Sequence, residues 1–147
     1  MIGFVITGHG EFAPGLAQAL SMIAGPQPHL AAVPFREGEP LDGYERRLGE
    51  ALAEVLRETS GALIFTDLLG GTPFRTAMLL ASRHENVEVL TGTNLPMLIE
   101  AGVLRAAESD VRALARQAVE IGTGGIQHVQ LPQEGPRREP PPDGEGI

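Results

Sequence analysis

Apolar and polar positions follow two kinds of pattern along this chain, short apolar runs and longer amphipathic stretches. The short runs are typical of buried strands, and apolar residues three or four positions apart are typical of helices that cover a core. The predicted strands are residues 2–7, 30–35, 62–66, 87–91 and 126–131. The predicted helices begin near Phe12, Leu41, Thr72, Asn94 and Ser109.

Several of these helices carry a recognisable start. Thr72 followed by Pro73 predicts an N-cap hydroxyl and then a proline at the first helical position. Asn94 and Ser109 are the predicted caps of the last two helices, because short polar side chains accept the unpaired N–H groups of a first turn. Gly122 is predicted to close the last helix.

Strands that alternate with helices predict an α/β fold, a three-layer sandwich around a mostly parallel sheet with right-handed crossovers. Pro34 lies inside the second strand, and proline cannot donate to a ladder, so this strand belongs at an edge. The third strand, 62–66, is apolar throughout and therefore central. The predicted order is 2-1-3-4, with 126–131 as a short antiparallel last strand.

Composition indicates one folded domain over residues 1–131. The chain has 147 residues, of which 42% are apolar, enough for a real core. From Pro132 onward the sequence is rich in Pro, Gly, Glu and Arg, so 132–147 is predicted to be a disordered tail. The first residues lack a basic start, and no apolar run approaches the roughly 18 residues of a membrane span, so a cytoplasmic location is expected.

Charge and residue usage exclude several classes of function. A net charge of −8 argues against a nucleic-acid surface, and it suits either plain solubility or a basic protein partner. The absence of cysteine excludes disulfides, thiolate catalysis and cysteine-ligated zinc. Lysine is also absent, so the glycine-rich turn at 70–71 lacks the lysine of a nucleotide-binding P-loop.

The predicted strand order brings two polar residues together. In such sheets ligand chemistry gathers at the carboxyl ends of the strands beside the topological switch, here strands one and three. Those ends carry His9, uncovered between two glycines, and Asp67. The other histidines, His29, His84 and His128, are interpreted as surface or structural positions.

An exposed imidazole can act as a nucleophile, a base or a metal ligand. A carboxylate that accepts the N–H of one ring nitrogen leaves the lone pair of the other free to attack, and Asp67 suits this role. The N–H groups of Gly71 and Thr72, with the Thr72 hydroxyl, are candidates to hold phosphoryl oxygens at a helix N-terminus. Taken alone, Asp67 also fits a turn cap and Thr72 an ordinary helix cap. One histidine with one aspartate is a poor metal site, so no metal is expected.

Three segments resemble the signatures of one family, the enzyme IIA proteins of the mannose family of the sugar phosphotransferase system. Residues 5–10, Val-Ile-Thr-Gly-His-Gly, resemble its phosphorylation-site segment. Residues 67–74, Asp-Leu-Leu-Gly-Gly-Thr-Pro-Phe, resemble its second signature, and residues 93–98, Thr-Asn-Leu-Pro-Met-Leu, its third. The resemblance spans about residues 1–131.

This resemblance implies a phosphotransferase with a phosphohistidine intermediate and no cofactor or metal. The phosphocarrier HPr would donate a phosphoryl group to His9, and Asp67 would orient that ring. The group would pass to a histidine on enzyme IIB and then to sugar at the membrane channel, so the membrane is met only through the permease complex. Family members are homodimers whose last strand, here 126–131, crosses to the partner's sheet; the residues alone leave folding back and crossing over open.

Other functions stay open at this point. A phosphotransfer subunit of a dihydroxyacetone kinase uses the same fold and an N-terminal histidine, although the turn at 70–74 and the segment 94–97 favour the sugar branch. A regulator would use phospho-His9 to signal sugar status. A small-molecule binding module without phosphoryl chemistry would leave the pairing of His9 with Asp67 unexplained. The sugar itself is not encoded, because a IIA protein touches only protein partners.

Overall fold

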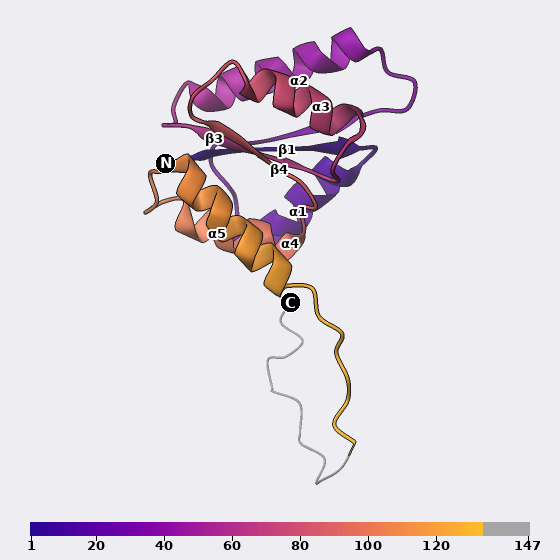
Figure 1. The fold of residues 1–147 in the computed structure, drawn as a ribbon, viewed down its shortest axis with the longest axis vertical. Helices are drawn as coiled ribbons and strands as arrows, with labels where there is room; N and C mark the ends of the chain where they lie inside the picture. The colour runs from indigo at the N-terminus through magenta and orange to yellow at the C-terminus, as the bar shows by residue number, and fades with distance from the viewer. Residues whose placement is uncertain (134–147) are drawn as a thin grey trace.

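The computed structural model describes residues 1–133. These residues form one parallel sheet with the strand order β2-β1-β3-β4 (Figure 1). The strands are β1 (Gly3–His9), β2 (Leu30–Phe35), β3 (Ala62–Thr66) and β4 (Val87–Leu90). The predicted fold class and strand order are confirmed, including the edge position of the strand that contains Pro34.

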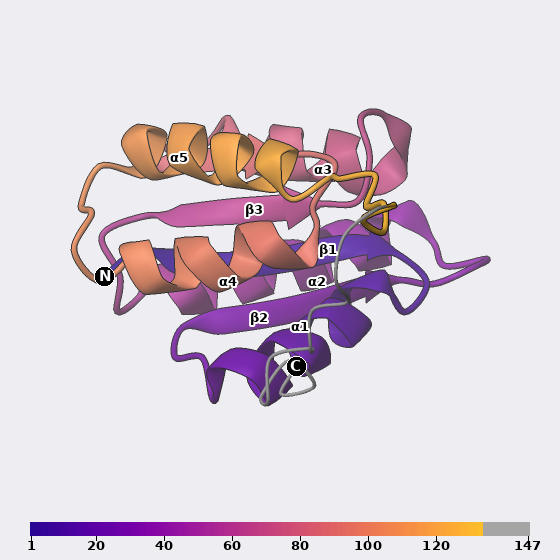
Figure 2. The same cartoon turned by 90° about the horizontal axis from the view of Figure 1, so that it is seen from below.

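Helices cover both faces of the sheet, as the three-layer prediction requires. They are α1 (Phe12–Ala24), α2 (Leu41–Leu56), α3 (Gly71–Ala81), α4 (Leu95–Leu104) and α5 (Val111–Gly124). One face carries α2 and α3, and the other carries α1, α4 and α5 (Figures 1 and 2). Within residues 1–133 no helix is both long and apolar enough to span a bilayer.

The alternation of side chains along β1 decides where its last residue points. Phe4 and Ile6 pack into the core under α1, α4 and α5, whereas Val5 packs into the core under α2 and α3. Successive side chains of a strand point to opposite faces, so Thr7 and His9 follow Val5. His9 therefore emerges at the carboxyl edge of the sheet, on the side of α2 and α3.

The start of α3 differs from its prediction. The helix begins at Gly71 with Gly70 as its N-cap, and no side chain caps it. Thr72 as the N-cap is therefore wrong, and its side chain lies in the first turn instead. Gly70 and Gly71 have φ angles of 90° and 81°, a left-handed turn that glycine adopts without strain.

The last two helices divide between a confirmed cap and a corrected one. Asn94 caps α4 as predicted, because its side-chain oxygen accepts the Met97 N–H at 3.1 Å. The cap of α5 is Asp110, which accepts the Arg112 N–H at 3.0 Å, and the prediction of Ser109 is wrong by one position.

The segment after α5 forms no strand within this chain. The helix runs to Gly124, past the predicted end at Gly122, and residues 126–133 have no regular secondary structure. Ile126, Val129 and Leu131 are 78%, 80% and 88% exposed. Within residues 1–133 the structure therefore shows no last strand in the chain's own sheet, and the strand exchanged between subunits stays a prediction. The tail predicted from Pro132 lies, from residue 134 on, outside the described residues.

A buried arginine lies at the amino-terminal ends of the strands, opposite the end of the sheet that carries His9. Arg105, at the end of α4, is 1% exposed and lies over the Phe4 ring at 4.4 Å. Its guanidinium donates to the carbonyl of Ile2 at 3.3 Å and to that of Pro28 at 2.7 Å. No carboxylate pairs with it within residues 1–133, and burial lowers its pKa. Arg105 thus joins α4, the start of β1 and the loop before β2 through carbonyl oxygens.

We expect Arg105→Ala to lower the free energy of unfolding by about 2–4 kcal/mol, because it opens a cavity and leaves buried carbonyls without donors. Urea denaturation measures this. The control is Arg57→Ala, whose exposed ion pair with Glu54 contributes little. A change for Arg105→Ala as small as that of the control would contradict the role given to Arg105.

Candidate functional site

The structure brings His9 and Asp67 into direct contact. Nδ1 of His9 lies 2.7 Å from Oδ2 of Asp67, and the same oxygen accepts the His9 backbone N–H at 2.9 Å. The His9 side chain is 50% exposed and that of Asp67 only 10%. A carboxylate accepts, so Nδ1 carries the proton and the exposed Nε2 keeps its lone pair.

Asp67 is held as an ionised acceptor. Burial raises the pKa of this carboxyl, but the hydrogen bonds from the His9 backbone and ring, together with the Leu68 N–H, lower it by more. The net result is a pKa below the ordinary value for aspartate. The second oxygen, Oδ1, is occupied by the Leu68 N–H at 2.9 Å, which fixes the plane of the carboxylate.

The contact depends on the missing side chain at Gly8. A Cβ atom there would lie 2.6 Å from Cδ1 of Phe12 and 3.0 Å from Cγ of Asp67, so either neighbour would have to move. Glycine at this position therefore lets Asp67 reach the imidazole. Gly10, with a φ of 57°, turns the chain from β1 toward α1.

The N-terminus of α3 borders the free edge of the imidazole. A Cβ atom on Gly71 would lie 3.3 Å from Cε1 and 3.6 Å from Nε2 of His9. Within residues 1–133 the N–H groups of Gly71 and Thr72 and the Thr72 hydroxyl form no hydrogen bond. Free donors at the positive end of a helix can hold an anion, so an anionic group on Nε2 would have these donors nearby.

Two aromatic residues that the sequence analysis did not single out complete the surroundings of the ring. Phe35 packs edge-on against the imidazole, with centroids 5.9 Å apart, and Tyr44 packs against Phe35 with centroids 4.8 Å apart. Phe35 pairs with His9 in the register of β2 and β1. The predicted strand order thus contained a signal for Phe35, since both residues end neighbouring strands.

The site is open to its surroundings. Leu68 and Leu69, which follow Asp67, are 51% and 76% exposed and form an apolar rim. Two hollows on the described part of the chain lie along β4 and between α2 and α3, and neither is lined by His9 or Asp67. Of the other histidines, His29 and His84 lie in loops at the amino-terminal ends of the strands, and His128 follows α5.

Comparison with known proteins places this geometry in a family. The model of the family described as PTS system fructose IIA component matches residues 3–119, which include both His9 and Asp67. The chain belongs to this family, the mannose-type IIA components. As a IIA component it serves sugar uptake through the phosphotransferase system and has a transferase role.

Named relatives match nearly the whole described chain. The PTS system fructose-specific EIIA component of Bacillus subtilis (strain 168) is 28% identical over 145 residues, 95% of this chain and 99% of the relative. The PTS system mannose-specific EIIAB component of Escherichia coli (strain K12) is 32% identical over 88% of this chain, which spans only 40% of that relative. Among solved structures, the mannose/sorbose specific IIA subunit from Enterococcus faecalis has a TM-score of 0.82 and 28% identity, covering 91% of this chain and 98% of its own.

The lowered pKa of Asp67 gives this IIA component a testable pH dependence. A carboxyl whose pKa is lower in the folded chain than in the unfolded chain stabilises the fold fully above the unfolded value, about 3.9. That stability is lost as the pH falls through the folded value. We expect the difference in free energy of unfolding between wild type and Asp67→Asn to be constant near neutral pH and to shrink below about pH 4.

Urea denaturation of both proteins over a pH series measures this difference. Asp42→Asn is the matched control, because it removes an exposed carboxylate that accepts only a local N–H, from Gly43 at 2.9 Å. A difference between wild type and Asp67→Asn that stays constant far below pH 4 would contradict the lowered pKa.

Proposed function

We propose that this IIA component accepts a phosphoryl group from HPr on Nε2 of His9 and passes it to a histidine of enzyme IIB in the cytoplasm. The observation that carries the proposal is the bond from Nδ1 of His9 to Asp67 at 2.7 Å, which leaves the opposite, exposed nitrogen as the nucleophile. Its lone pair attacks the donor's phosphorus, and the donor's P–N bond breaks with its electron pair staying on the donor. Transfer to IIB runs the same exchange in reverse.

The surroundings of Nε2 suit the charges that this exchange creates. The imidazole becomes positive as the P–N bond forms, and the ionised Asp67 beside Nδ1 stabilises that charge. The phosphoryl oxygens are negative, and the free N–H groups of Gly71 and Thr72, with the Thr72 hydroxyl, are the proposed donors to them. The mechanism uses no metal and no cofactor.

The openness of the site supports a protein as the donor. A small phosphorylated metabolite needs an enclosing pocket for recognition, whereas His9 is half exposed beside the apolar rim of Leu68 and Leu69. Such a rim suits a protein interface, and the net charge of −8 favours a partner with a basic surface. The relatives named above are sugar phosphotransferase components, so the proposal follows that branch and not the dihydroxyacetone kinase.

We expect incubation with phosphoenolpyruvate, enzyme I and HPr to give an acid-labile, base-stable phosphate that is absent from His9→Ala. Asp67→Ala should keep the fold and slow transfer roughly 10²–10⁴-fold, because the ring loses its set tautomer. His84→Ala, in a loop at the amino-terminal ends of the strands, is the control and should be labelled like wild type. Label retained by His9→Ala would exclude His9 as the acceptor.

We also propose a homodimer in which residues 126–131 of each subunit pair with the partner's β4. The Ala62 N–H donates to the Asn86 carbonyl at 3.0 Å, so Val87 and Val89 turn their backbone groups away from β3. A hollow runs along this edge between Met78 of α3 and Val111 of α5. An open edge beside an exposed apolar segment favours strand exchange.

The other edge of the sheet is blocked over its last residues. The Gly10 N–H donates to the Phe35 carbonyl at 2.8 Å, so the even-numbered residues of β2 face outward. Pro34 has no N–H, and Nη2 of Arg47 occupies its carbonyl at 2.8 Å. The Arg36 N–H donates to Glu39 at 3.0 Å. These contacts favour β4 over β2 as the edge for the exchange.

We expect deletion of residues 126–131 to turn a dimer into a monomer or an aggregate in sedimentation velocity, because β4 loses its cover. A chain that ends at Gln133 is the control and should remain dimeric and accept phosphate. A full-length monomer at micromolar concentration would contradict the dimer. A dimer in which each segment pairs with its own chain would contradict the exchange alone.

A further inference from the structure

We infer that Tyr44 is a positioning residue for phosphoryl transfer, which holds the His9 imidazole through Phe35 on one side and Thr7 on the other. The inference rests on the proposed role of His9 as the phosphoryl acceptor. Tyr44 is the only tyrosine of the chain and is fully buried, so it touches neither donor nor acceptor protein.

Asp67 alone does not fix the imidazole. Both N–H groups that His9 offers, from the ring and from the backbone, go to the same oxygen of Asp67. A ring held at one nitrogen can still swing, because the second torsion of a histidine side chain has a broad energy profile. Phe35 packs against the ring from β2, with the two ring planes at 78°. It limits the swing on the side away from β3.

Phe35 needs support of its own, since it ends an edge strand and is only partly buried. That support is Tyr44, which α2 places against Phe35 with an angle of 55° between the rings. Tyr44 belongs to the buried cluster under α2 and α3 and cannot move without opening that cluster. The position of Phe35 therefore follows that of Tyr44.

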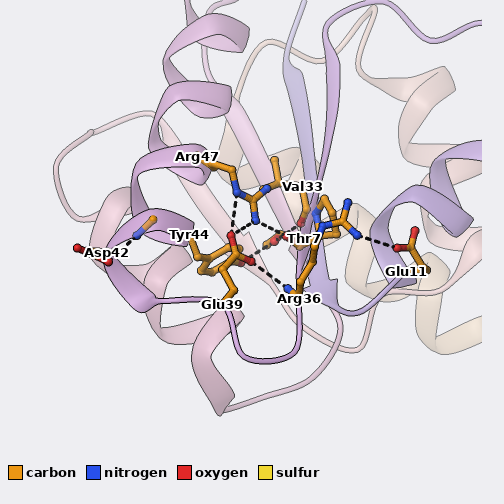
Figure 3. Close-up of polar contacts among 10 residues, drawn as sticks. Thr7, Glu11, Val33, Arg36, Glu39, Asp42, Tyr44 and Arg47 are labelled. Carbon is orange, nitrogen blue, oxygen red and sulfur yellow. Dashed lines mark hydrogen bonds and ion pairs between the residues drawn. The ribbon is translucent and has the colours of Figure 1, made fainter.

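The hydroxyl of Tyr44 fixes the second end of this support. It lies 2.6 Å from Oγ1 of Thr7, which itself donates to the Val33 carbonyl at 2.7 Å (Figure 3). The single hydroxyl proton of Thr7 is thus committed, so Tyr44 is the donor between them. Burial raises the pKa of Tyr44 to about 12, and the hydroxyl keeps its proton at neutral pH.

Together these contacts restrain the orientation of the His9 imidazole. Thr7 lies two residues before His9 on β1, and Tyr44 joins the backbone there to the aromatic ring that flanks the imidazole. Transfer requires Nε2 within about 3–3.5 Å of the donor's phosphorus and in line with the bond that breaks. Small displacements of the attacking atom are costly in such reactions, so a restraint on ring orientation increases the rate constant for transfer.

The test is Tyr44→Phe, which keeps the buried ring and removes the hydroxyl. We expect the rate constant for transfer from phospho-HPr to fall roughly three- to tenfold, the effect of one neutral hydrogen bond, with an unchanged KM for the donor. Thr7→Val removes this bond and also the bond to the Val33 carbonyl, so it should give at least as large a fall, and the double variant no larger fall than Thr7→Val alone. In the unphosphorylated wild-type protein, the ¹⁵N signals of the His9 ring should be those of a single ring orientation. In Tyr44→Phe the same signals should be broadened by exchange between orientations.

Leu48→Val is the matched control. Leu48 is fully buried one turn later on α2 in the same cluster, so this variant lowers stability while it keeps the hydroxyls of Tyr44 and Thr7 and both aromatic rings in place. A rate loss in Leu48→Val equal to that in Tyr44→Phe would assign the effect to general stability and overturn the inference.

Two further results would also overturn it: wild-type rate and NMR signals in Tyr44→Phe, or a raised KM with an unchanged rate constant. If wild-type protein accepted no phosphate, the proposed function would fail. The His9 ring signals of Tyr44→Phe would still decide whether Tyr44 positions the ring.

Discussion

The site depends on where two neighbouring parallel strands, β1 and β3, end relative to each other. Thr7 of β1 pairs with Thr66 of β3, so Asp67, one residue beyond this pair, and His9, two residues beyond it, emerge at nearly the same height. Parallel pairing fixes this height through a ladder of backbone bonds, and the empty space at Gly8 allows the final approach. Only a short turn separates β3 from α3, and α3 therefore starts beside the imidazole.

The features that followed from the sequence are those with a local cause. Pro34 marks an edge strand wherever it occurs, and an unbroken apolar run such as 62–66 belongs in the middle of a sheet. These two facts fix most of the order 2-1-3-4, and the order brings His9 to Asp67. The first residues of helices were harder to predict. Ser109 and Asp110 are equally good caps in adjacent positions, and only the path of the chain determines which of them caps α5.

The features that the sequence did not reveal depend on contacts between distant residues. Tyr44 meets Thr7 across 37 positions, and Arg105 meets Ile2 across 103. A tyrosine on the apolar side of an amphipathic helix predicts burial but not the partner of its hydroxyl. At Thr72 the sequence suggested a cap, whereas two glycines with positive φ make the turn, and the hydroxyl does not cap the helix.

The two edges of the sheet are unequal, and this sets how far association can extend. A sheet with two available edges can add subunit after subunit and grow into a filament. Here Pro34, the Arg47 side chain on its carbonyl and the Glu39 side chain on the next outward N–H block pairing at the last residues of β2. In the proposed exchange each subunit supplies one segment and receives one at β4, so the assembly would stop at a closed pair.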